Sequence, residues 1–124
     1  MIKSKSYNVC VFCGSKDGNN EKYKKVAIKI GKELSKRNYN VIYGGGRIGI
    51  MGALAEGVMT NKGNLISIVP KYFQNKNVIL KSSNKTMFTK DFFERKKIMI
   101  KFADIFLVLP GGYGTLDELF EVIS

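Results

Sequence analysis

The sequence predicts an α/β fold built on an open, doubly wound parallel sheet. Short apolar runs alternate with amphipathic stretches along the whole chain, which is the pattern of parallel strands joined by crossover helices. Three of these runs lead directly into glycine-bearing turns, as strand-to-helix connections of this fold often do. With 124 residues, of which 44% are hydrophobic, the chain has the size of one globular domain, and we expect residues 1–124 to form it.

The first half of the chain predicts two strand–helix pairs. Apolar residues 8–12 predict the first strand, and the helical periodicity of residues 20–37 predicts the first helix. A second strand is expected at residues 41–43, followed by a short helix over residues 50–58. The residues expected on the buried face of the first helix are Tyr23, Ala27, Ile30, Gly31 and Leu34.

The second half continues the alternation after an irregular segment. The third strand is expected at residues 65–69, and residues 71–85 lack periodicity and predict a surface loop beside the mouth of a site. A short strand follows at residues 86–89, and Asp91 is the expected N-cap of the third helix. Residues 105–109 predict a fifth strand.

The formal net charge of +11 raises the question of nucleic-acid binding. Only three of the 21 basic residues are arginine, and the lysines are spread over the first helix and many loops. This bias is typical of a solvated surface, because arginine is the better side chain for reading bases, and we expect no nucleic-acid partner. No run reaches the roughly 18 apolar residues that cross a bilayer, and no cleavable signal is evident. We therefore expect a cytoplasmic protein without a membrane partner.

The two cysteines do not predict a disulfide or a metal site. Cys10 and Cys13 fall on or just after the first strand, where they would face opposite sides of the sheet. The chain has no histidine and no second cysteine pair, so we expect no bound metal. No other feature requires a cofactor.

The segment from Pro110 to Glu118 predicts an anion-binding loop. It follows an apolar strand and places three glycines before a helix start, where backbone N–H groups point at negative charge. Glu118 comes three residues after Thr115, so its carboxylate lies beside the loop as a candidate base. Residues 44–49 form a second glycine turn with an expected ligand-facing role. The acidic residue that a dinucleotide fingerprint has after the next strand is missing, since Ser67 and Val69 stand there, and this argues against NAD.

Arg95 and Lys96 lie near the start of the third helix. Taken alone, they would be an exposed basic pair on a solvated face. At the carboxyl edge of the sheet, an arginine near a helix start reaches the same cleft as Glu118 and can hold a phosphate through two hydrogen bonds.

Three motifs in the right order resemble the LOG family, the cytokinin riboside 5′-monophosphate phosphoribohydrolases. They are the Gly-Gly-Gly-x-x-Gly-x-Met-Gly stretch from Gly44, the Glu94-Arg95-Lys96 triplet, and Pro-Gly-Gly-x-Gly-Thr-x-x-Glu from Pro110. The resemblance implies a Rossmann-like fold, usually dimeric. It also implies hydrolysis of the N-glycosidic bond of AMP or an N6-substituted relative without a cofactor.

The resemblance assigns roles to individual residues. Arg95 and Glu118 match the family's catalytic pair. The residues expected to bind the nucleotide or its phosphate are Ser15, Gly45, Gly46, Lys96, Gly111, Gly112, Gly114 and Thr115. The family often has Met-His before its Glu-Arg-Lys, whereas this chain has Phe92-Phe93.

The chain ends six residues after Glu118, where family members continue with another strand and helix. We therefore expect a C-terminally truncated version that either has reduced stability or has its exposed sheet edge covered by dimerisation. Two alternatives stay open at this point. One is a noncatalytic nucleotide-binding or carrier module of the same fold, and the other is a single-stranded-DNA-binding Rossmann protein. The sequence leaves the preferred base and N6 substituent undetermined.

Overall fold

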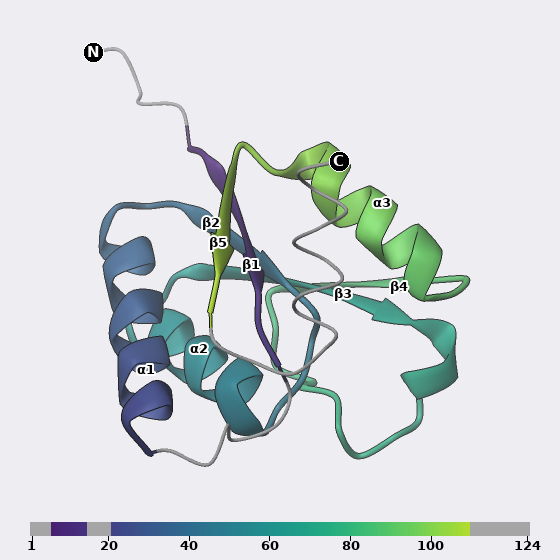
Figure 1. Cartoon of the computed structure of the whole chain (residues 1–124), viewed down its shortest axis with the longest axis horizontal. Coiled ribbons are helices and arrows are strands. Elements are labelled where there is room, and N and C mark those ends of the chain that lie inside the picture. The colour runs from purple at the N-terminus through teal and green to yellow at the C-terminus, as the bar shows by residue number, and fades with distance from the viewer. Residues whose placement is uncertain (1–5, 15–20, 110–124) are drawn as a thin grey trace.

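The predicted α/β architecture is confirmed by a computed structural model that describes residues 6–14 and 21–109. Five parallel strands form one sheet in the order β4-β3-β2-β1-β5 (Figure 1). The elements are β1 (Asn8–Phe12), α1 (Glu21–Lys36), β2 (Asn40–Tyr43), α2 (Gly49–Thr60), β3 (Asn64–Pro70), the 3-10 turn η1 (Lys71–Phe73), β4 (Lys85–Thr89), α3 (Phe92–Phe102) and β5 (Ile105–Val108).

The strand order reverses next to β1. From β1 to β4 each new strand adds to the same side of the sheet, and β5 then returns to the other side of β1. Helices α1 and α2 cover one face of the sheet, and α3 covers the opposite face (Figure 1). A ligand of a doubly wound sheet binds outside the carboxyl ends of the strands at such a reversal. The fold therefore directs attention to the ends of β1 and β5.

The strand side chains alternate between two core clusters. Val9 and Val11 belong to the cluster beneath α1 and α2, whereas Cys10 and Phe12 belong to the cluster beneath α3. Cys13 joins the first cluster, so the expectation that the two cysteines face opposite sides is confirmed. They do not bond to each other.

The predicted boundaries agree with the structure to within one or two residues, and two side chains differ from the expected burial pattern. Tyr23 is 40% exposed, although its spacing put it on the buried face of α1. Ser35 is buried in its place at the other end of the helix, where its Oγ donates to the carbonyl oxygen of Val58 at 3.3 Å. This hydrogen bond to α2 offsets the free-energy cost of burying the Ser35 hydroxyl. The periodicity of apolar residues does not predict such a contact.

The two helices on the first face cross at glycines. A Cβ atom on Gly31 would lie 2.5 Å from the backbone oxygen of Leu54, and one on Gly57 would lie 2.1 Å from the backbone oxygen of Ile28. Backbone atoms cannot move aside as a flexible side chain can. The close packing of α1 on α2 therefore depends on these two glycines.

The substitution Gly57→Ala should lower the free energy of unfolding by about 2 kcal/mol, because the new methyl group meets the α1 backbone and outweighs alanine's better helix propensity. Urea unfolding followed by circular dichroism measures the change. Glu56→Ala, at the adjacent exposed position of α2, is the matched control and should stay within about 0.5 kcal/mol of the parent. Equal stability of the two variants would contradict the close helix crossing.

Candidate functional site

The end of β1, the end of β5 and the start of α2 meet at the reversal point of the sheet. The amide of Met51, in the first turn of α2, donates to the carbonyl oxygen of Gly14 after β1 at 3.0 Å. The amide of Leu109, directly after β5, donates to the carbonyl oxygen of Phe12 at 2.9 Å. These bonds tie the start of α2 and the end of β5 to the end of β1. The glycine-bearing turns expected after β1 and β2 are thus joined through the start of α2, and the glycine turn expected after β5 falls outside the described residues.

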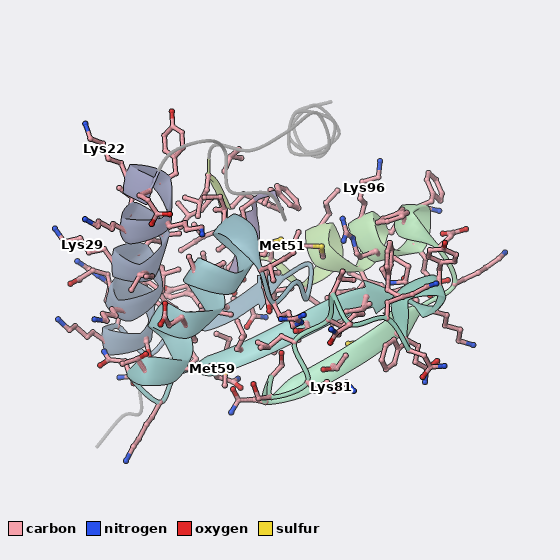
Figure 2. All side chains as sticks on the ribbon, turned by 90° about the horizontal axis from the view of Figure 1, so that it is seen from below. Lys22, Lys29, Met51, Met59, Lys81 and Lys96 are labelled. Carbon is pink, nitrogen blue, oxygen red and sulfur yellow. The ribbon has the colours of Figure 1, made fainter. Side chains whose placement is uncertain are left out.

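Side chains on the glycine turn after β2 would collide with neighbouring atoms, most severely at Gly45. Gly45 has a φ of +85°, and a Cβ atom there would lie 2.4 Å from Cγ2 of Val69. Local packing and backbone conformation therefore explain this glycine. Gly44 and Gly46 differ, because the atoms that would obstruct a Cβ at 2.8 Å belong to the flexible side chain of Met51. Figure 2 shows Met51 reaching from α2 toward α3.

Buried polar groups hold this turn from inside the sheet. The hydroxyl of Tyr43, the last residue of β2, donates to the carbonyl oxygen of Gly46 at 3.0 Å. Burial raises the pKa of this hydroxyl far above its ordinary value, and hydrogen bonds with Ser67 and Ser83 oppose the rise only in part. The tyrosine thus remains a neutral donor. The two serine hydroxyls lie 2.5 Å apart and connect β3 with the segment before β4.

The segment before β4 lies against the same turn. The amide of Leu80 donates to the carbonyl oxygen of Gly45 at 2.9 Å, and the amide of Arg47 donates to that of Val78 at 3.0 Å. The Nε of Arg47 also donates to the carbonyl oxygen of Asn77. Residues 77–80, which we expected to lie in a loop beside a site, therefore pack along the glycine turn.

Arg95 extends from the other face of the sheet to the glycine turn. Asp91 caps α3 by accepting a hydrogen bond from the amide of Glu94 at 2.9 Å, as expected, and this fixes where the helix begins. One turn further on, Nη1 of Arg95 lies 3.0 Å from the position that a Cβ of Gly44 would occupy. The carbon between its two terminal nitrogens lies 4.9 Å from the centre of the Phe92 ring. Arg95 is therefore packed against the turn and is not part of a solvated basic face.

Of the predicted site residues, Gly45 and Gly46 lie in the glycine turn, and Arg95 reaches that turn at its first residue, Gly44. Lys96 lies in α3 next to Arg95, but consecutive helical residues point about 100° apart, and its side chain extends away from Met51 in Figure 2. The other predicted site residues, Ser15, Gly111, Gly112, Gly114, Thr115 and Glu118, lie outside the described residues.

Three contributors to this site were not predicted in these roles from the sequence: Met51, Tyr43 and Phe92. Met51 stands within the glycine motif, and its position could have suggested contact with the turn. Tyr43 and Phe92 each contact a site residue three positions further along the chain, and this local spacing could have suggested both contacts. Within residues 6–14 and 21–109, no group of three or more histidine, cysteine, aspartate or glutamate side chains could hold a metal ion.

The arrangement is suited to an anion. A guanidinium group and the backbone of a glycine turn share the edge of the sheet where a doubly wound fold binds ligands. The family profile described as "Possible lysine decarboxylase" matches residues 51–124, a segment that includes Arg95 and the predicted phosphate loop. The chain belongs to this family, the LOG family.

Two curated LOG relatives from Arabidopsis thaliana align with essentially the whole chain. Cytokinin riboside 5′-monophosphate phosphoribohydrolase LOG1 is 42% identical over 123 residues, which is 99% of this chain and 58% of the relative. The corresponding LOG5 protein is 40% identical over 124 residues, covering 100% of this chain and 54% of the relative. The chain thus spans a little over half the length of these LOG proteins.

A solved structure similar to this LOG-family chain is the molybdenum cofactor binding protein from Rippkaea orientalis. It has a TM-score of 0.82 and 19% sequence identity, and the match covers 98% of this chain and 72% of that protein. At this identity the similarity concerns the fold, which is Rossmann-like as the sequence predicted.

The substitution Tyr43→Phe should lower the free energy of unfolding by about 1–2 kcal/mol, because it leaves the Gly46 carbonyl oxygen without its buried donor. Tyr23→Phe removes an identical hydroxyl from the surface of α1 and should leave stability within about 0.5 kcal/mol. Chemical unfolding of both variants measures the difference. A Tyr43→Phe protein as stable as the parent would show that the hydroxyl does not brace the turn.

Proposed function

We propose that this protein hydrolyses the N-glycosidic bond of AMP or of N6-substituted adenosine 5′-monophosphates and releases the free base and ribose 5-phosphate. The observation that carries the proposal is the position of the Arg95 guanidinium against the Gly44–Gly46 turn, next to the point where the strand order reverses. The names of the relatives support the same chemistry.

In the proposed reaction, Arg95 and Glu118 act at the ribose. Cleavage at C1′ passes through an oxocarbenium-like state, which the Glu118 carboxylate would stabilise while it takes a proton from the attacking water. The water oxygen bonds to C1′, and the base leaves with the electrons of the broken C–N bond and takes up a proton. Arg95 would hold phosphate or ribose oxygens in place.

The nucleotide would be anchored mainly by its 5′-phosphate. Backbone N–H groups near a helix start and a threonine hydroxyl are suitable donors for a phosphate, and fixing it brings C1′ to the carboxylate. The residues proposed to make these contacts are Ser15, Gly45, Gly46, Lys96, Gly111, Gly112, Gly114 and Thr115.

Incubation with AMP and with isopentenyladenosine monophosphate, followed by chromatography of the free base, tests this function. The parent protein should release base from at least one substrate, and Glu118→Gln should reduce the rate by about 100-fold or more, because the carboxylate is lost with little change of shape. Asp117→Asn, at the neighbouring acid, is the matched control and should keep nearly full activity.

Two outcomes would reject the hydrolase. A folded protein that binds AMP without releasing adenine would be a noncatalytic nucleotide-binding or carrier module. A protein that ignores AMP but binds single-stranded DNA with steep salt dependence would be a nucleic-acid-binding protein. In that case the single-stranded DNA would bind to the outer side of α1, where Lys22 and Lys29 extend away from α2 (Figure 2).

We also propose that the protein acts as a homodimer in the cytoplasm. Phe102, Ile105 and Val108 are 46%, 38% and 39% exposed, which leaves apolar surface on α3 and β5 for a second copy to cover. The buried thiols of Cys10 and Cys13, which do not bond to each other, fit a reducing compartment. In the described part of the chain, no helix has both the length and the apolar character needed to span a membrane.

Sedimentation velocity should give a mass of twice the 13.9 kDa of one chain, because burial of this apolar surface favours association. Phe102→Ser, at an exposed position of α3, should shift the equilibrium toward the monomer. A monomer at all concentrations of the parent protein would contradict the homodimer.

A further inference from the structure

Three aromatic rings from two elements form a connected cluster beside Arg95. Tyr72 and Phe73 lie in η1, directly after β3, and Phe92 is the first residue of α3. The ring centres of Tyr72 and Phe73 are 5.0 Å apart with the planes at 88°, and those of Phe73 and Phe92 are 5.6 Å apart with the planes at 71°. Both are edge-to-face contacts, the geometry that aromatic pairs favour.

The last ring of this cluster contacts the Arg95 guanidinium. The central guanidinium carbon lies 4.9 Å from the centre of the Phe92 ring, within the range of a cation–π interaction. The same guanidinium reaches the glycine turn, where Nη1 lies 3.0 Å from the position of a Cβ on Gly44. The Nε atom has no solvent-exposed surface. The arginine side chain is thus packed against both an aromatic ring and the glycine turn.

Core packing does not account for Phe92 at this position, because 51% of the residue is exposed. The ring lies three residues before Arg95 in α3, so the two side chains are neighbours on one helix face. Phe73 contacts the ring from outside the helix and limits the directions that it can take. The Phe92 ring therefore contributes more to the contact with Arg95 than to the hydrophobic core.

We propose that Phe92 is a positioning residue: its ring, braced by Phe73 and Tyr72, holds the Arg95 guanidinium against the Gly44–Gly46 turn in the orientation that receives the nucleotide. This inference rests on the proposed function and adds to it a residue that acts through Arg95. Phe92 stands outside the glycine and Glu-Arg-Lys motifs. The motifs alone do not reveal its role.

The next residue of α3 offers an internal control. The Lys97 ammonium lies 4.4 Å from the centre of the Phe93 ring, so the same kind of contact occurs one position further along the chain. Phe93 is 58% exposed, close to the value for Phe92. Among the described residues, the nearest neighbours of the glycine turn include neither Phe93 nor Lys97, so removal of the Phe93 ring should affect the surface alone.

The test compares Phe92→Leu, Phe92→Tyr and Phe93→Leu in the full chain. The first readout is the nitrogen–proton resonance of the Arg95 Nε, which burial protects from rapid exchange. An aromatic ring at position 92 should change the chemical shift of this resonance. We expect this change in the parent protein, in Phe92→Tyr and in Phe93→Leu, and we expect it to vanish in Phe92→Leu only. The second readout is AMP affinity, which should fall about three- to thirtyfold in Phe92→Leu and remain unchanged in the other two variants.

The third readout is base release, for which Phe92→Leu should lower kcat/KM at least as much as it lowers AMP affinity. All three variants should unfold at similar temperatures, since both rings are largely exposed. An unchanged Arg95 resonance in Phe92→Leu, an equal loss of affinity in Phe93→Leu, or no rescue by tyrosine would overturn the positioning role. If the parent protein releases no base, the proposed hydrolase fails, while the resonance and the AMP affinity still decide the role of Phe92.

Discussion

The absence of side chains on the turn after β2 allows the elements of both sheet faces to meet there. Met51 from α2 and Arg95 from α3 occupy space that Cβ atoms on Gly44 and Gly46 would enter. Gly45 is constrained further, because its positive φ and its contact with Val69 both exclude a side chain. The position of the arginine, and with it the proposed binding of an anion, depends on this one stretch of backbone without side chains.

The glycine turn is held on two other sides. Tyr43 donates to it from within the sheet, and burial keeps that hydroxyl protonated. The segment before β4 pairs with it from outside through the bond from Leu80 to Gly45. A backbone that is fixed in this way presents its polar groups without further rearrangement, which is the property that a phosphate- or ribose-binding site requires.

The sequence predicted most of the fold because its signals are local. The periodicity of residues 20–37 and the capping side chain of Asp91 determine element type and boundaries within a few residues, and both predictions are confirmed. The burial of Ser35 was not predicted, because it depends on a hydrogen bond to Val58 in α2. A partner so distant in the sequence does not change the local pattern of apolar residues.

The candidate site was predictable in part for the same reason. Glycine motifs pointed to Gly45 and Gly46, and the order of the motifs placed Arg95 near them. The contacts from Tyr43 to Gly46 and from Phe92 to Arg95 each join residues three positions apart, so they are local. The packing of Phe73 against Phe92 could not be predicted, because it depends on the distance between η1 and α3, which only the folded chain sets. Roles assigned to residues 111–118 remain predictions that await a ligand complex.

A crystal structure of the Glu118→Gln protein with AMP would test the central claim most directly. The account predicts that the nucleotide lies at the carboxyl edge of the sheet, with the Arg95 guanidinium and the Gly44–Gly46 backbone both within hydrogen-bonding distance of its phosphate or ribose oxygens. Binding of AMP at another surface, such as the lysines along α1, with Arg95 and the glycine turn making no contact, would contradict it.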